Sequence, residues 1–216
     1  DLMSECSDFS FLFVGHWLGG EFGHDRKDIA TMVKAFHETF ENKSQKNQPT
    51  LILKTGMSGF SRVDEMNIIE RIQKLVPPSG PAIKLLHGDL TPEQLNKLYN
   101  HKKVKAMLSF TKGEGFGRPL LEFGITGKPI IATNWSGHVD FLKHATLLPG
   151  QLRPVHPSAQ WKDVIVEGSN WFYVDYPTAK NYIKVLHKDY KVFTEESRKQ
   201  PSHIKKNFSL AKADEV

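Results

Sequence analysis

Residues 104–127 read VKAMLSFTKGEGFGRPLLEFGITG, and this stretch decides the fold. It opens with a largely apolar run at 104–109, which predicts a buried strand. The helix predicted at 119–127 begins with proline and ends with glycine, as helices often do. Between strand and helix lies a loop that contains Gly113, Gly115 and Gly117. A strand, a glycine-rich loop and a helix in this order indicate one unit of a parallel α/β sheet.

The same alternation continues in both directions along the chain. Apolar runs predict further strands, and segments with apolar residues at helical spacing predict the helices between them. The predicted strands are 9–15, 50–54, 82–86 and 129–133, and the predicted helices are 28–40, 61–75 and 91–99. Repeated units of this kind predict a doubly wound, Rossmann-like parallel sheet with helices on both faces.

The helix at 61–75 and the segment beyond Pro149 each lead to a further prediction. On the helix at 61–75, four apolar side chains are expected to face the core: Met66, Ile69, Ile72 and Leu75. Beyond Pro149 the pattern loosens into an irregular segment rich in proline, and a short strand at 171–174 and a helix at 177–190 follow it. The polar segment at 195–216 is expected to be helical.

Charge and cysteine content limit the class of protein. The chain has 29 Lys and Arg residues against 24 Asp and Glu residues, a net charge of +5. This mild and evenly spread excess suits an anionic ligand but does not indicate a nucleic acid partner. Because Cys6 is the only cysteine, the chain forms no internal disulfide, which fits a reducing compartment.

The start of the chain carries no sign of export or of a membrane anchor. The apolar run at 9–14 is too short to span a bilayer, and it lacks the basic flank and cleavage site of a secretory signal. We therefore expect a cytoplasmic protein without a transmembrane segment. The first predicted strand begins almost at once, a start that suits both a complete α/β enzyme and a piece of a longer protein.

The glycine loop has the composition of a phosphate-binding loop. Glycine lets the backbone approach a ligand closely, and Pro119 in a first helical turn leaves unpaired backbone N–H groups directed out of the loop. Such a helix start suits a diphosphate. Glu114 and Glu122 would be unfavourable there unless they accept hydrogen bonds from sugar or ribose hydroxyls. Taken alone, these residues are more simply a solvated loop acid and an exposed helix acid, so the prediction of a nucleotide-sugar site depends on the whole pattern.

The sequence EGFGRPLLE at 114–122, with GKPIIATNWSG at 127–137 behind it, resembles the donor-site signature of retaining glycosyltransferases of family four, the group 1 type. Further matching segments extend the resemblance over residues 9–142 in the expected order, among them FVG at 13–15 and the helix-opening segment at 88–99. The resemblance implies the C-terminal, donor-binding half of a GT-B architecture. We expect a nucleotide-sugar-binding domain at 1–190 and a C-terminal helical tail at 191–216.

The resemblance also implies a role for each matching residue. The catalytic residues would be Glu114, which contacts the donor sugar, and Lys27, which neutralises the phosphates as the leaving group gains charge. Glu122 would hold the ribose, and backbone N–H groups of the glycine loop would meet the diphosphate or the sugar. The residues implied to bind the nucleotide sugar are His16, Arg26, Gly115, Phe116, Gly117, Arg118 and Glu122. No metal or other cofactor is implied.

Some positions leave two interpretations open. The family often has arginine where this chain has His16, which weakens one leaving-group contact or makes it pH-dependent. Arg118 stands where the family is usually apolar, so it is either an additional phosphate ligand or a surface charge. The pair Arg26 and Lys27 fits a phosphate clamp and, almost equally, a solvated helix start. His87 could contact the base or cap a loop.

The expected function is transfer of a sugar, with retention of configuration, from a nucleotide-diphosphate donor to an unknown acceptor. The acceptor site of such enzymes lies on an N-terminal domain that is absent from this chain. We therefore expect the isolated chain to be an incomplete enzyme that binds a nucleotide sugar weakly. The alternatives are an enzyme like the nucleotide-sugar epimerases and a non-catalytic nucleotide-binding module.

Overall fold

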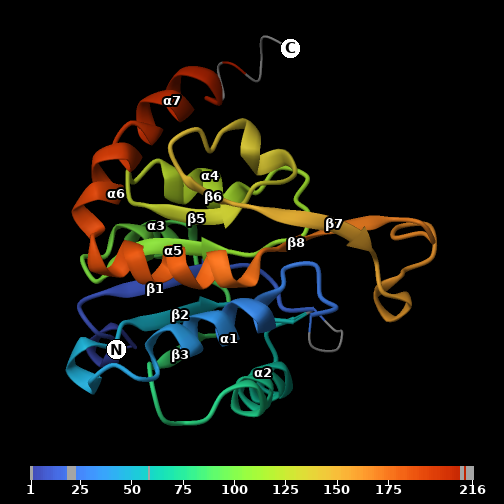
Figure 1. Ribbon diagram of the computed structural model, residues 1–216, viewed down its shortest axis with the longest axis horizontal. Coiled ribbons are helices and arrows are strands. Elements are labelled where there is room, and N and C mark those ends of the chain that lie inside the picture. Colours follow the sequence, from blue (N-terminus) through green and yellow to red (C-terminus); the bar gives the residue numbers. More distant parts are fainter. Residues whose placement is uncertain (1, 19–22, 58, 210–211, 213–216) are drawn as a thin grey trace.

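The computed structural model describes residues 2–18, 23–57, 59–209 and 212. Its centre is a six-stranded sheet with the order β3-β2-β1-β4-β5-β6, in which all neighbouring strands are parallel (Figure 1). The strands are β1 Ser10–Val14, β2 Thr50–Lys54, β3 Ile83–Leu86, β4 Val104–Ser109, β5 Ile130–Thr133 and β6 Thr146–Leu148. The predicted doubly wound, Rossmann-like sheet is therefore confirmed.

Helices cover both faces of this sheet, and a hairpin extends from it. The helices are α1 Ile29–Phe40, α2 Arg62–Leu75, α3 Pro92–Asn100, α4 Arg118–Gly124, α5 Tyr176–Lys188, α6 Tyr190–Ser197 and α7 Gln200–Asn207. Strands β7 Gly150–Pro154 and β8 Asn170–Val174 form an antiparallel pair that projects away from the sheet (Figure 1). The hairpin lies on the side of the molecule where the loop between β1 and α1 emerges.

The alternation of side chains along the strands explains the two helical layers. In β1, Phe11 and Phe13 belong to a core that also contains Phe36 of α1 and Ile183 of α5. The residue between them, Leu12, belongs to a second core with residues of α3 and α4. Because successive strand residues point to opposite faces, a continuous apolar strand has a hydrophobic layer on each side.

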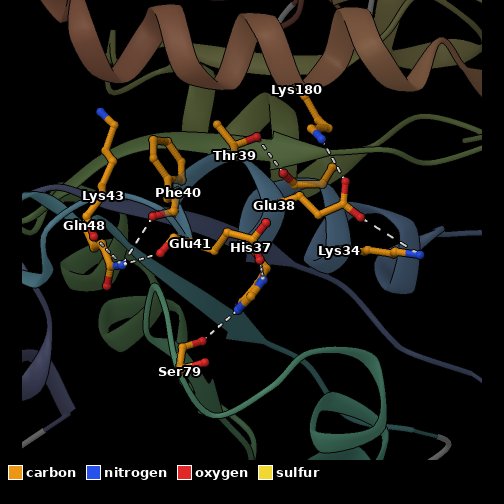
Figure 2. Close-up of polar contacts among 11 residues, drawn as sticks. Lys34, His37, Glu38, Thr39, Phe40, Glu41, Lys43, Gln48, Ser79 and Lys180 are labelled. Atoms are coloured by element: carbon orange, nitrogen blue, oxygen red, sulfur yellow. Dashed lines mark hydrogen bonds and ion pairs between the residues drawn. The ribbon is translucent and has the colours of Figure 1, made fainter.

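Helix α1 is fixed at its C-terminal half by polar contacts (Figure 2). The carboxylate of Glu38 accepts a hydrogen bond from the ammonium group of Lys180 on α5, at 2.8 Å. The side-chain amide of Gln48 donates to three carbonyl oxygens at the end of the helix, those of Phe40, Glu41 and Lys43. Helix ends leave such carbonyls without partners, so these bonds stabilise the end of α1 and tie the helix to its neighbours.

Helix α2 differs from the expectation in the side chains that it buries. Met66 and Ile69, expected to face the core, are 63% and 40% exposed, and the buried residue is Ile68. Ile72 and Leu75 do pack against the core. Apolar residues on α2 are spread over more than one face, so the helical period alone fits two orientations.

The C-terminal part of the chain is more regular than expected. The segment beyond Pro149, expected to be irregular, contains β7, which pairs with β8 over its full length. The final helices pack on the domain: the Gln200 side chain donates to the carbonyl of Phe141 and accepts from the backbone N–H of His144, and Ile204 is buried. Residues 210–211 and 213–216 of the expected tail lie outside the described residues.

Candidate functional site

The candidate site lies where the strand order reverses, between β1 and β4. In open α/β sheets ligands bind outside the carboxyl ends of the strands at this point. The loop after β1 carries His16, Arg26 and Lys27, and the loop after β4 carries Glu114. Residues 19–22, which belong to the loop after β1, lie outside the described residues.

Side chains from the first loop contact the second loop directly. The ammonium group of Lys27 forms an ion pair with the carboxylate of Glu114. The guanidinium of Arg26 lies 3.5 Å from the same carboxylate and donates to the carbonyl of Gly113. Only 15% of the Lys27 side chain and 11% of the Glu114 side chain are exposed. Burial lowers the pKa of Lys27, while the charge of Glu114 acts in the opposite direction.

The loop after β5 holds the backbone of Glu114 in place. The backbone N–H of Glu114 donates to the hydroxyl of Ser136 at 2.8 Å, and the carbonyl of Glu114 accepts from the backbone N–H of Gly137 at 3.0 Å. A Cβ atom on Gly137 would lie 1.9 Å from the carbonyl oxygen of Gly115, so only glycine fits at this position. Three loops thus converge on Glu114.

A cleft of about 360 Å³ opens beside this cluster. The residues that line it and that the sequence singled out are His16, Arg26, Lys27, Arg118 and Glu122. Glu114 does not line the cleft, but its partner Lys27 does. These five residues bring three cationic side chains and one carboxylate to the cleft, an arrangement suited to an anionic ligand that also carries hydroxyl groups.

Glu122 lies in the first turns of α4 and has two polar partners. One carboxylate oxygen accepts from the hydroxyl of Tyr99 at 3.1 Å, and the other lies 3.2 Å from Nε of Arg118. Burial and the charge of Glu122 both raise the pKa of the Tyr99 phenol, so this hydroxyl remains a hydrogen-bond donor. Arg118, with 79% of its side chain exposed, is the most accessible of the three cations.

The glycine loop itself lies outside the residues that line the cleft. Gly117 has a left-handed backbone, with φ of 87°, and precedes α4, which spans seven residues. Phe116 is half exposed, and its ring centroid lies 5.3 Å from that of Phe141. For Gly115, Phe116 and Gly117, contact with a ligand therefore stays a prediction.

Two charged residues that the sequence analysis did not single out also line the cleft, Lys54 and Asp89. Lys54 ends β2, and its ammonium group lies 4.7 Å from the centre of the Phe60 ring. Burial lowers its pKa. The sequence signal for Lys54 was a lysine at the end of a largely apolar strand, because ligands bind outside the carboxyl ends of the strands.

Among the described residues, His87 and the other histidines form no metal site. The His87 ring packs edge-on against Phe60, and its Nε2 is buried without a hydrogen-bond partner among the described residues. The part of the chain that the structure describes has no group of three or more His, Cys, Asp or Glu residues that could hold a metal ion. Within the same residues, no helix is both long and apolar enough to cross a bilayer.

Comparison with known proteins identifies the family. The family model described as glycosyl transferases, group 1, matches residues 24–185, three quarters of the chain, and the chain therefore belongs to this family. This confirms the resemblance on which the sequence analysis relied. A comparison with curated protein sequences gives no match.

Solved structures with the same fold include several glycosyltransferases. The catalytic domain of cholesterol-α-glucosyltransferase from Helicobacter pylori has a TM-score of 0.58 and 15% identity, and the match covers 91% of this chain and 96% of that one. The C-terminal domain of the group 1 protein LpcC from Francisella tularensis has a TM-score of 0.58 and 12% identity over 95% of this chain and 88% of that one. The fold is thus that of a C-terminal GT-B half, as expected.

One neighbour with the same fold is longer than this chain. HepE from Anabaena, in complex with UDP and glucose, has a TM-score of 0.63 and 13% identity. The match covers 99% of this chain and 48% of that one. The chain therefore spans about half the length of HepE.

Proposed function

We propose that this chain is the donor-binding half of a retaining glycosyltransferase and that its cleft holds a nucleotide-diphosphate sugar. The observation that carries this proposal is the convergence of Arg26, Lys27 and Arg118 on one cleft together with Glu122. A diphosphate requires cationic partners, and a ribose requires an acceptor for its hydroxyls. The cleft offers both at the switch point of the sheet.

The chemistry proposed for this cleft depends on the charge that develops on the leaving nucleotide. When the bond between the sugar and the diphosphate breaks, negative charge grows on the β-phosphate, and Lys27 with Arg26 would stabilise it. Glu114, paired with Lys27, would accept hydrogen bonds from the sugar hydroxyls. In this proposal the cationic side chains perform the role for which other enzymes use a metal ion.

The acceptor and the stereochemical outcome belong to the whole protein. We propose that a further, N-terminal domain, which the family resemblance implies, completes the acceptor site, so that this chain alone binds a donor with little turnover. Membership of a glycosyltransferase family favours transfer over the epimerase-like alternative. The division into a donor domain at 1–190 and a tail at 191–216, and the cytoplasmic location, stay predictions.

Calorimetric titration tests the binding proposal. Since HepE has been crystallised with UDP-glucose and with UDP, UDP is the first nucleotide to titrate, followed by GDP and ADP. We expect one of them to bind wild-type protein and to bind Glu122→Gln more weakly, because the amide cannot replace the carboxylate as a double acceptor. No heat with any of the three nucleotides contradicts the proposal. Binding without turnover in the complete protein supports the non-catalytic module instead.

A further inference from the structure

Lys112 lies near the start of the loop that follows β4, two residues before Glu114, but does not line the cleft. Its side chain is fully buried. The ammonium group donates to the carbonyls of Gly23 and Asp25, the latter at 3.0 Å, and lies 3.4 Å from the carboxylate of Asp28. An ammonium group has three N–H donors, so these three partners account for all of them.

The polar partners of the Lys112 ammonium group all belong to one segment, residues 23–28, which also carries Arg26 and Lys27. The backbone adds to this contact, because the N–H of Lys112 donates to the carbonyl of Arg26 at 2.8 Å. Asp28, which ends the segment, has a left-handed backbone with φ of 50°, an unusual conformation for a residue other than glycine. The segment therefore depends on contacts from outside itself to keep its shape.

The hairpin closes the other side of Lys112. The ammonium group lies 4.5 Å from the centre of the Tyr173 ring and 5.3 Å from the centre of the Trp171 ring, both on β8. The carbonyl of Lys112 accepts from the backbone N–H of Phe172 at 3.1 Å. Aromatic faces stabilise a desolvated cation, so β8 and the segment at 23–28 together enclose this charge.

We propose that Lys112 is a positioning residue for the phosphate-binding pair: it holds residues 23–28 in the conformation that directs Arg26 and Lys27 toward the cleft. The proposal rests on the proposed function for the identity of the ligand. Lys112 touches no ligand itself in this account. Its loss weakens nucleotide binding although both cationic side chains of the pair remain.

The test must separate positioning from a contribution to stability alone. Lys112→Met removes the ammonium group and leaves the carboxylate of Asp28 buried without its partner, which destabilises the fold. The double variant Lys112→Met/Asp28→Asn removes both charges, and asparagine tolerates the left-handed backbone at position 28. Its melting temperature should therefore recover in part relative to the single variant, while Asp25, whose buried carboxyl also interacts with the Lys112 charge, remains in both. Lys103→Met is the matched control, because Lys103 also donates to two backbone carbonyls, those of Met3 and Cys6, away from the cleft.

Two measurements on these proteins test whether Lys112 positions residues 23–28. In the double variant, UDP affinity should remain about tenfold or more below wild type despite the partly recovered melting temperature, whereas Lys103→Met should bind UDP as wild type does. Amide hydrogen exchange in residues 23–28 should accelerate by about tenfold or more in both Lys112 variants and stay unchanged in Lys103→Met. A double variant that regains both stability and affinity, or unchanged exchange in 23–28, overturns the proposal.

The two readouts also separate this inference from the proposed function. Absence of nucleotide binding in wild-type protein contradicts the proposed function. Hydrogen exchange in residues 23–28 needs no nucleotide, so it then still decides whether Lys112 holds the segment.

Discussion

The ammonium group of Lys27 contacts the carboxylate of Glu114, which stands 87 positions further along the chain. Each residue follows a different strand of the sheet, and the two strands, β1 and β4, are neighbours. The ion pair therefore joins the two loops at the switch point. A bound diphosphate would therefore compete with Glu114 for the ammonium group of Lys27.

This competition predicts opposite effects of two substitutions on nucleotide binding. Lys27→Met removes a charge-assisted contact and should weaken UDP binding about 10- to 100-fold, the equivalent of about 1.5–3 kcal/mol. Glu114→Gln releases Lys27, so UDP affinity should be equal to or higher than that of wild type. Calorimetric titration of both variants gives the comparison, and weaker binding by Glu114→Gln contradicts the assignment.

The contact between the loops after β4 and β5 predicts a sharp difference between two glycines. Gly137→Ala would place a methyl group 1.9 Å from the carbonyl oxygen of Gly115, so the glycine loop must move. We expect UDP affinity to fall by about tenfold or more. Gly113→Ala is the control, because a Cβ atom there meets nothing within 4 Å, and it should bind UDP normally. Equal affinities in the two variants would show that the glycine loop does not shape the cleft.

The buried carboxyl of Asp28 predicts a pH dependence of stability. Burial raises its pKa from 3.8 to about 6, against the opposing effect of Lys112. Between these two pH values the native protein holds a proton that the unfolded chain has lost, so the contribution of Asp28 to stability falls as the pH rises through this window. Above about pH 6 that contribution is fully lost.

Denaturation of wild type and Asp28→Asn measures this effect. Asp25 and Lys112 face Asp28 and remain in both proteins. The free energy of unfolding of wild type, relative to that of the variant, should decrease by about 1–3 kcal/mol between pH 4 and pH 6.5. A difference that is constant, or that grows with pH, contradicts the raised pKa.

The orientation of α2 predicts unequal effects of truncating two neighbouring apolar residues. Ile68→Ala removes a fully buried side chain and should lower the free energy of unfolding by about 2–5 kcal/mol. Met66→Ala removes a side chain that is 63% exposed and should change the free energy of unfolding by about 0.5 kcal/mol or less. Urea denaturation gives both values. A larger loss in the free energy of unfolding for Met66→Ala than for Ile68→Ala would support the orientation that the sequence pattern predicted.

Strands β1 to β5 of the parallel sheet could be predicted because they are short apolar runs that alternate with helical periods, whereas the sequence did not lead to a prediction of the three-residue strand β6. Strand β7 could not be predicted, since Pro149 precedes it and Pro154 ends it, and prolines usually mark irregular backbone. Its pairing with β8 lies outside the main sheet, where proline is tolerated. The orientation of α2 escaped prediction because the helix presents apolar residues on several faces.

For the site, the sequence motif placed Glu114, Glu122 and the basic pair Arg26 and Lys27 at the carboxyl edge, and the structure brings them together. The role of Lys112 could not be read from its neighbours in sequence. Its partners come from residues 23–28 and from β8, and only the folded chain brings these segments to one point.

A crystal structure of the chain with UDP would show directly whether the cleft holds a nucleotide diphosphate. We expect the diphosphate to lie in the cleft, with oxygen atoms of the β-phosphate within hydrogen-bond distance of Lys27 and Arg26, and with the ribose hydroxyls on Glu122. UDP bound elsewhere on the chain, or in the cleft with its phosphates turned away from Lys27, would contradict the proposed function.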